Sequence, residues 1–103
     1  MTLSVRWLSY DFTVYNPLMT TWNDVAGVYI FTGQDRIGRW VALYVGQADS
    51  LRNRFSSHEQ WSPAVRLGAT HVHAMVVPLQ ADRDRIEREL IQAYQPTLNL
   101  QLG

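Results

Sequence analysis

The sequence predicts one α+β domain, built on a small, mostly antiparallel sheet of three strands flanked by helices. Its 103 residues, 47% of them hydrophobic, suffice for a single core but are too few for two. Runs typical of strands and of helices are interleaved along the chain in the order β-β-α-α-β-α. The first two strand runs are separated by residues 32–38, a glycine-containing stretch of the kind that closes a hairpin.

Residues 1–25 are predicted to be an extension in front of the domain proper, which spans residues 26–103. In the extension, Leu3, Val5 and Trp7 alternate with polar residues, and this alternation favours an extended arm or an edge strand. An Asn-Pro pair further along is typical of a break after such a strand.

The strands of the domain proper are expected at three apolar runs rich in β-branched and aromatic residues. Glycine opens the first run and proline follows the third, as is common at strand ends. The three runs are residues 27–31, 39–45 and 70–77.

Three helices are predicted from capping residues and apolar periodicity. Asp49 is expected to cap a helix that follows the second strand. Pro63 begins a second, short helix, which Gly68 ends. Asp82 is expected to cap the last helix, which stops before Pro96 and leaves a terminal tail.

The composition narrows the classes of function. Nine acidic and nine basic residues give a net charge of zero, so the overall charge does not indicate binding to nucleic acid or membrane. All nine basic residues are arginine, whose guanidinium suits two-point binding of phosphate or carboxylate. The absence of cysteine excludes disulfides, thiolate metal sites and cysteine nucleophiles. No stretch has the pattern of a signal peptide or the length of a membrane span, so a soluble cytoplasmic protein is expected.

Glu87 lies at the border of the apolar face of the last predicted helix. Ile86 and Leu90 define that face, and a carboxylate at its edge needs a cation, a metal or backbone donors as a partner. The alternative is a border glutamate whose carboxylate reaches water. Glu89 points away from the face and stands four residues after Arg85, the spacing of a solvent ion pair.

Five further polar or aromatic residues are candidates only as a group. Arg54 and His58 stand one helical turn apart, beside the apolar face of the first predicted helix. Tyr29 and Tyr44 each lie within a strand, where tyrosine is usually a half-buried core residue. Asn99 stands three residues after Pro96 and is typical of a turn. Each of these residues taken alone has a sufficient structural explanation.

His71 and His73 suggest a different chemistry. Alternation along a strand places both imidazoles on the same face, and such a pair can supply two ligands to zinc, iron or copper. A third ligand would have to come from elsewhere, with His58 or Glu87 as the options. The alternative is a pair of histidines that line a polar sheet face and form local hydrogen bonds.

The motifs together resemble the GIY-YIG nuclease family, and most of all its branch in bacterial nucleotide-excision repair. The two family motifs stand here as Gly-Val-Tyr at 27–29 and Tyr-Val-Gly at 44–46. Arg54 lies ten residues beyond Tyr44, with a histidine one turn later. Twelve residues separate Glu87 from Asn99 in a Pro-x-x-Asn ending, a register that Glu89 does not match. The resemblance covers about residues 26–100.

The resemblance implies a set of catalytic roles. A single Mg²⁺ or Mn²⁺ would be held by Glu87, and Arg54 would bind the scissile phosphate. Tyr29 or Tyr44 would act as the general base or orient the attacking water, and the sequence does not decide between them. His58 would be a partner of the base or a contact to phosphate. Asn99 would orient the glutamate or contact the phosphate.

Arginines near these motifs are the expected contacts to nucleic acid, because they can form a local basic patch despite the neutral total. Gln47 belongs to the same set and stands where the repair branch of the family has lysine, so no lysine can assist at that position. The predicted nucleic-acid-binding residues are Gln47, Arg52, Arg54, Arg66 and Arg88, with Arg83 and Arg85 as further members of the basic patch.

The expected function is a metal-dependent endonuclease that hydrolyses phosphodiester bonds, in DNA more readily than in RNA. The first alternative is a non-catalytic nucleic-acid-binding module of the same fold, which the neutral charge slightly favours. The second is a metal enzyme built on His71 and His73. The expected partners are nucleic acid and either a second copy of the chain or a targeting protein, contacted through the aromatic N-terminal extension.

Overall fold

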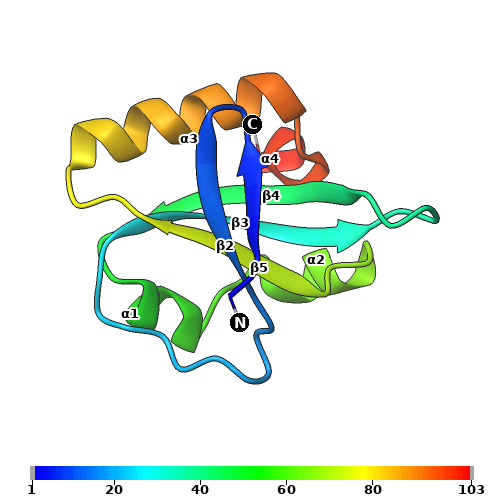
Figure 1. The fold of residues 1–103 in the computed structure, drawn as a ribbon, viewed down its shortest axis with the longest axis horizontal. Helices are drawn as coiled ribbons and strands as arrows, with labels where there is room; N and C mark the ends of the chain where they lie inside the picture. Colours follow the sequence, from blue (N-terminus) through cyan, green and yellow to red (C-terminus); the bar gives the residue numbers. More distant parts are fainter. Residues whose placement is uncertain (1, 103) are drawn as a thin grey trace.

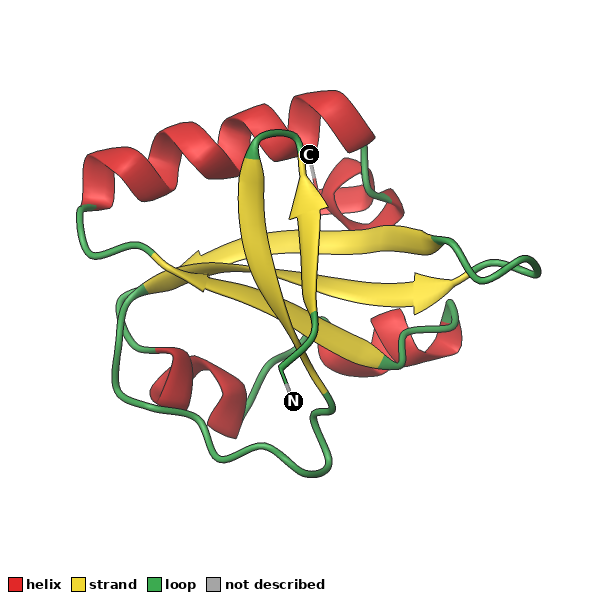
Figure 2. Ribbon diagram, viewed as in Figure 1, coloured by secondary structure: helices red, strands yellow, loops and turns green. Residues whose placement is uncertain are grey.

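Residues 2–102, the part of the chain that the computed structural model describes, form one antiparallel sheet with helices on both faces (Figure 1). The strand order across the sheet is β1-β2-β5-β3-β4. Helix α3 lies on one side of the sheet and α1 and α2 on the other, while α4 lies against the edge strand β4 (Figure 2). The elements are β1 (Ser4–Trp7), β2 (Tyr10–Tyr15), β3 (Gly27–Gln34), β4 (Trp40–Ala48), α1 (Leu51–Ser56), α2 (Trp61–Arg66), β5 (His71–Val76), α3 (Gln80–Tyr94) and α4 (Thr97–Leu102).

The α+β class and the three strands of the domain proper are confirmed, but the prediction of a three-stranded sheet is wrong, because the sheet has five strands. The two additional strands, β1 and β2, form a hairpin that joins the sheet through β5, with Thr13 opposite Ala74. Leu8 in the hairpin turn has a positive φ of 55°, and the Leu-Ser turn lacks the Asn-Gly, Asp-Gly or Gly-containing pair that marks a two-residue hairpin in a sequence. The Leu8 N–H donates to the Tyr94 hydroxyl at 2.9 Å, a contact to a distant helix. The division at residue 25 stays a prediction.

The core lies on both faces of the sheet, because β3 lies inside the sheet between β5 and β4, and its alternate residues point to opposite sides. Tyr29 and Phe31 pack on the face that α1 and α2 cover. Val28 and Ile30 pack on the other face, against Leu90 of α3. All of these residues are at most 1% exposed, so the region around the Gly-Val-Tyr motif is held rigidly from both sides.

Two of the predicted helix caps are wrong. Ser50, rather than Asp49, caps α1, and its side chain accepts the Asn53 N–H at 3.2 Å. The Asp49 carboxylate instead accepts a hydrogen bond from the buried Arg83 at 2.8 Å. Helix α3 begins at Gln80 without a side-chain cap, so Asp82 lies within its first turn.

The C-terminal segment is a short helix, α4, and not the predicted tail. Leu98 of α4 packs in the same core cluster as Tyr29 and Phe31 and is 4% exposed. The side-chain amide of Asn99 both donates to the carbonyl of Val45 and accepts its N–H, each at 2.8 Å. Strand β4 is at the edge of the sheet, so Asn99 satisfies backbone groups that a further strand would otherwise pair with.

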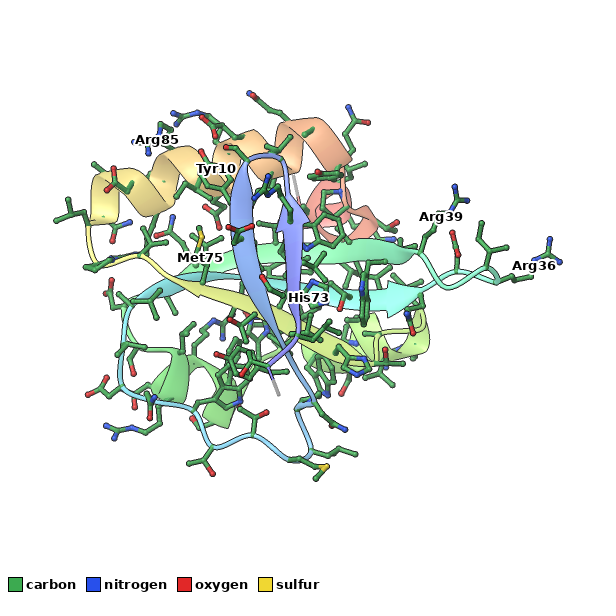
Figure 3. All side chains as sticks on the ribbon, viewed as in Figure 1. Tyr10, Arg36, Arg39, His73, Met75 and Arg85 are labelled. Atoms are coloured by element: carbon green, nitrogen blue, oxygen red, sulfur yellow. The ribbon has the colours of Figure 1, made fainter. Side chains whose placement is uncertain are left out.

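The hairpin between β3 and β4 extends away from the rest of the molecule, with Arg36 at its tip and Arg39 where the loop returns to β4 (Figure 3). The Asp35 carboxylate closes this turn by accepting the N–H groups of Ile37 and Arg39, at 3.0 and 2.9 Å. The predicted loop at residues 32–38 is thus shorter than expected, because β3 continues to Gln34.

Candidate active site

A tyrosine and a histidine meet beneath the aromatic face of the sheet. Tyr29 comes from β3 and is 1% exposed, and its hydroxyl lies 2.6 Å from Nε2 of His58, in the segment between α1 and α2. The rings of Phe31 and Phe55 surround this pair at centroid distances of 4.7 to 6.3 Å. The sequence placed Tyr29 and His58 in one group, and the structure brings them into direct contact.

The hydrogen bonds of His58 define its tautomer. Nδ1 accepts the Gln60 N–H at 3.0 Å, so in the neutral ring the proton is on Nε2. Burial, followed by the charge of Arg54, lowers the pKa of His58 to about 4, against an opposing effect of Glu59. His58 is therefore neutral at pH 7, and its Nε2–H donates to the Tyr29 oxygen. In this arrangement it stabilises negative charge on the phenol oxygen and does not accept its proton.

The glycine of the second motif makes room for Tyr29. Gly46 lies within β4, directly opposite Tyr29 across the β3–β4 pair, so the strand extends beyond the predicted end at residue 45. A Cβ at Gly46 would stand 2.5 Å from the Tyr29 hydroxyl oxygen and 2.9 Å from the Tyr44 ring. Only glycine leaves space for both tyrosines. The glycine of the second motif is therefore required by the tyrosine of the first.

The two tyrosines differ in their surroundings. Burial raises the pKa of Tyr29, and the nearby Tyr44 raises it further, while the charge of Arg54 lowers it. Burial also raises the pKa of the half-buried Tyr44, which Arg54 again opposes. Both phenols are therefore protonated at neutral pH unless additional positive charge stands beside them.

Arg54 is held by a carboxylate that sequence analysis did not single out. Its Nη2 and Nη1 donate to the two oxygens of Glu59 at 2.8 and 3.0 Å, a bidentate pair. The pair raises the pKa of Arg54 and lowers that of Glu59 to about 2. A carboxylate and a phosphate present similar paired oxygens to arginine, so the guanidinium face that binds Glu59 also suits a phosphate. The sequence signal was only the five-residue separation, which predicts no contact.

A second cluster lies along α3, where Glu87 is half-buried as its border position predicted. The side-chain amide of Gln47 donates to Glu87 at 3.1 Å and to Asp84 at 2.8 Å. Gln80 donates to Asp84 and to the Gln47 oxygen, each at 2.7 Å. These bonds lower the pKa of Asp84, so it is ionised at neutral pH. Asp84 is one turn before Glu87 and was missed, since its position on the helix resembles an ordinary exposed residue.

The two clusters form one site at the edge strand β4. Gln47 and Tyr44 both belong to β4 and contact opposite clusters. The charge of Glu87 reaches both Tyr29 and Tyr44 and raises the pKa of each. The phenols, the guanidinium and the carboxylates therefore interact electrostatically across the strand.

The carboxylates fit a Mg²⁺ ion better than a metal enclosed by protein ligands. Within residues 2–102, no three His, Cys, Asp or Glu side chains are close enough to hold a metal together. Mg²⁺ is commonly bound by one or two carboxylates and keeps several of its waters. Glu87 and Asp84 supply that donor set, with the Gln47 amide as a neutral group that hydrogen-bonds to both.

The histidine-metal alternative lacks its third ligand among residues 2–102. His73 is fully buried, and its Nδ1 accepts the indole N–H of Trp7 at 2.9 Å. Trp40 packs on both His71 and His73, with ring centroids 5.2 and 4.6 Å away. The structure therefore favours the structural interpretation of this pair.

The predicted nucleic-acid contacts have different environments. Arg52 pairs with Asp24 at 3.3 Å, while Arg66 and Arg88 are exposed on α2 and α3. Arg83 is 4% exposed and donates to the carbonyls of Val77 and Pro78. The prediction that it belongs to a surface basic patch is therefore wrong.

Glu89 and Arg85 do not form the predicted ion pair. Arg85 pairs with Asp82 at 3.0 Å. Glu89 instead accepts the hydroxyl hydrogen of Tyr10, which attaches the N-terminal hairpin to α3 beside Arg85 (Figure 3).

Asn99 also departs from its expected role. Its amide is fully used by Val45, next to Tyr44, and it forms no hydrogen bond with Glu87 among residues 2–102. In this structure it fixes the strand that carries the second tyrosine.

Solved structures of GIY-YIG domains share this architecture. The GIY-YIG N-terminal endonuclease domain of UvrC from Thermotoga maritima, bound to its catalytic divalent cation magnesium, matches with a TM-score of 0.61 and 28% identity, over 80% of this chain and 89% of that chain. A variant of that domain with an asparagine changed to alanine has the same TM-score and identity, over 80% and 88%. A tyrosine-to-phenylalanine variant gives 0.58 and 29%, over 74% and 83%. No protein-family model and no curated protein matches the chain.

The resemblance to the GIY-YIG nuclease family is thus confirmed by structure. The fold, and the likeness to endonuclease domains of that class, support a nuclease. No helix within residues 2–102 is long and apolar enough to span a membrane.

Proposed function

We propose that this chain is a metal-dependent endonuclease that hydrolyses phosphodiester bonds in nucleic acid. The observation that carries the proposal is the meeting of Tyr29, His58 and Arg54 on one side of β4 with Glu87 on the other. A non-catalytic binding module of the same fold would not need a half-buried carboxylate within electrostatic reach of two tyrosines. The 28% identity to a magnesium-bound endonuclease domain supports the same conclusion.

Each residue of the site has a role that follows from its position. Arg54 binds the scissile phosphate once the phosphate replaces Glu59 on its guanidinium. Tyr29 or Tyr44 orients the attacking water and accepts its proton as the phenolate, after its own proton has passed to solvent. His58 stabilises the ionised Tyr29 by donating to its oxygen. Glu87, with Asp84 one turn away, would hold Mg²⁺ or Mn²⁺. When bound, such an ion supplies positive charge that stabilises the phosphoryl oxygens and favours ionisation nearby.

The choice between DNA and RNA is the finer part of the proposal. DNA is the substrate that the family resemblance implies. The exposed Arg66 and Arg88, together with Arg52 and Gln47, are the proposed contacts to its backbone. A neutral domain has weak electrostatic affinity for a duplex, so a second copy or a targeting partner in the cell is consistent with the composition.

The test is a cleavage assay with labelled single-stranded, duplex and flapped DNA and with RNA, each in Mg²⁺, Mn²⁺ or EDTA. Wild-type protein is expected to cut at least one substrate only when a divalent ion is present. Arg54→Ala is expected to abolish cutting while the circular dichroism spectrum stays unchanged. Binding without cutting on every substrate would favour the non-catalytic module, and cutting in EDTA would refute the metal requirement.

A further inference from the structure

A cavity of about 290 Å³ lies beside the tyrosine–histidine pair, and the proposed chemistry does not use it. Trp22, Phe55 and Trp61 contribute its aromatic walls, and His58 is part of the lining as well. This volume is at the lower end of the range of small-ligand pockets, about 300–1,000 Å³, so the cavity suits a ring system and not a large molecule. We propose that this cavity binds one nucleobase of the substrate, next to the scissile phosphate; the inference rests on the proposed nuclease function.

The cavity walls are suited to a flat aromatic ligand. Trp22 and Phe55 meet edge to face at a centroid distance of 4.5 Å, and Trp61 meets Phe31 in the same way at 5.0 Å. All three wall residues are only partly buried although they are among the largest apolar side chains of the domain. Partly exposed aromatic rings around a hollow form a surface on which a base can stack.

The rim of the cavity provides hydrogen-bonding groups without charge. Ser57 and Ser62 are among its lining residues, and both are exposed. The Ser56 hydroxyl donates to the Asn53 carbonyl at 2.7 Å. The hydroxyls of Ser57 and Ser62 can pair with the edge of a base, which carries both donors and acceptors.

The link to a phosphate identifies the ligand as a nucleotide. His58 lines the cavity and also contacts the Tyr29 hydroxyl at 2.6 Å. Arg54 donates to the Ser57 carbonyl at 3.4 Å, so the phosphate-binding guanidinium stands next to the rim. A neutral aromatic ring in the cavity, joined to an anion at Arg54, is the composition of a nucleotide. A base can enter such a cavity from single-stranded substrate or after leaving a duplex stack.

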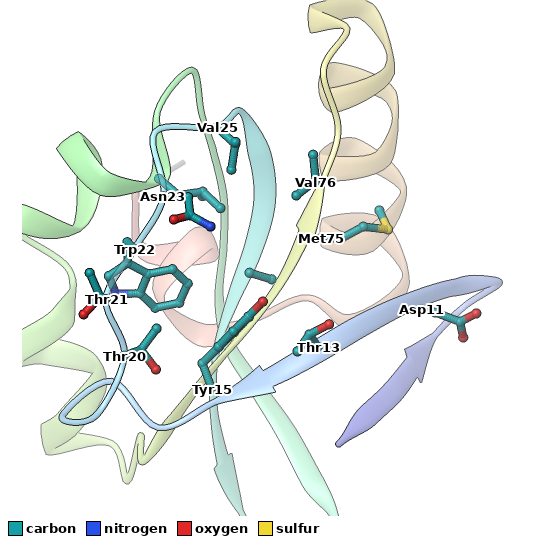
Figure 4. A pocket seen from close by; sticks show the side chains of 12 residues that line it. Asp11, Thr13, Tyr15, Thr20, Thr21, Trp22, Asn23, Val25, Met75 and Val76 are labelled. Carbon is teal, nitrogen blue, oxygen red and sulfur yellow. The ribbon is translucent and has the colours of Figure 1, made fainter. Parts of the chain in front are cut away.

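The N-terminal extension supplies part of this cavity. Trp22 lies in the segment between β2 and β3, and its indole packs on Tyr15 of β2 at a centroid distance of 4.9 Å (Figure 4). Leu18, 93% exposed, comes from the same segment and also lines the cavity. Trp22 also lines a second hollow of about 250 Å³, together with Thr13 and Thr20 (Figure 4). That hollow does not include His58, so it is not part of the proposal. The extension therefore contributes a base-binding wall to the nuclease domain.

The test measures binding of single-stranded oligonucleotides to full-length Glu87→Gln protein by fluorescence anisotropy. One probe is intact, and the others each carry a single abasic residue at successive positions. Base stacking on an aromatic side chain contributes about 1–3 kcal/mol, so one abasic position is expected to weaken binding by about five- to a hundredfold. Trp22→Ala is expected to weaken binding of the intact probe equally and to remove the effect of that abasic position, whereas Trp22→Phe retains most affinity.

A second readout does not depend on how the Trp22→Ala protein folds. Binding of the intact probe to Glu87→Gln protein is expected to quench tryptophan fluorescence, because Trp22 and Trp61 line the cavity, and the critical abasic probe is expected to quench it less. Equal affinity and equal quenching for all probes would overturn the base site. Wild-type cleavage together with that result would leave the nuclease proposal intact. A single critical position without cleavage on any substrate would instead refute the nuclease and support the base site.

Discussion

The two sides of strand β4 make an instructive comparison, because the proposed site uses both. On one side, Tyr29 and His58 are enclosed by aromatic rings, and burial is the largest influence on the pKa of each. On the other side, Asp84 and Glu87 lie on a helix surface, and amide groups of glutamine are their nearest partners. Burial keeps the first pair neutral, while hydrogen bonds to side-chain amides favour the ionised carboxylate of Asp84.

In the proposed hydrolysis, the two sides of β4 have different roles. The buried side, which carries Tyr29 and His58, can fix the direction of hydrogen bonds to an attacking water, but burial there disfavours any charge. A wetter side can keep carboxylates ionised and bind a hydrated cation. Substitutions on the two sides should therefore have different signatures, in metal dependence on one side and in stability on the other.

Removing the Glu87 charge is expected to have the largest effect. Glu87→Gln should lower the cleavage rate by at least about a hundredfold at every Mg²⁺ concentration, because a metal-binding carboxylate is lost. Asp84→Asn should lower it less, by about tenfold, and added Mg²⁺ should restore most of the rate. Rates measured across a Mg²⁺ titration distinguish the two.

Glu89→Gln is the matched control for both, since it makes the same change on the same helix and keeps an acceptor for Tyr10. Its rate should be close to that of the wild type. An equal loss in Glu89→Gln and Glu87→Gln would mean that the helix charge, and not a metal site, is responsible.

Adding a methyl group opposite Tyr29 tests how rigidly the buried side of the site is packed. Gly46→Ala should destabilise the fold by about 2–3 kcal/mol, because its Cβ would stand 2.5 Å from the Tyr29 oxygen, within a well-packed region. Urea unfolding measures this loss. Adding Tyr29→Phe should recover part of it by removing the closest atom, and strict additivity of the two changes would contradict the steric explanation.

Acid should destabilise the protein through its two buried histidines. The pKa values of His58 and His73 are both lowered to about 4 from 6.5, so the unfolded chain binds more protons between these pH values. Their contribution to stability is therefore complete above about pH 6.5 and decreases as the pH falls towards 4. Between pH 7 and pH 5 we expect a loss of about 2 kcal/mol, allowing for the partial exposure of His58. A free energy of unfolding that stays constant or rises over this range would show that the histidines are not held neutral.

Releasing Arg54 from Glu59 should have the smallest effect. Glu59→Gln, in the inactive Glu87→Gln protein, is expected to tighten oligonucleotide binding by about two- to fivefold, since an exposed ion pair contributes at most about 1 kcal/mol. Asp11→Asn, which removes an exposed partner of Arg6, is the control and should change affinity little. Weaker binding by Glu59→Gln would mean that Glu59 orients the guanidinium and does not compete with phosphate.

Local patterns in the sequence determined the parts of the fold that short-range chemistry controls. Three strands and the long helix α3 followed from β-branched runs and from the 3.6-residue period. The border position of Glu87 followed from the same period, and the structure finds it half-buried. The resemblance to the GIY-YIG family placed Tyr29 and His58 in one group, and the structure brings them within 2.6 Å.

Only the tertiary structure decided which distant groups meet. The hairpin of β1 and β2 depends on pairing with β5 and on contacts of Leu8 and Tyr10 to α3, which lie some eighty residues away in sequence. The hydrogen bond between Val45 and the Asn99 side chain depends in the same way on a partner from another element. So does the His58 tautomer, which decides that His58 donates to Tyr29. Propensity and periodicity report on one face of one element, whereas hydrogen bonds and burial depend on whatever the chain places opposite that face.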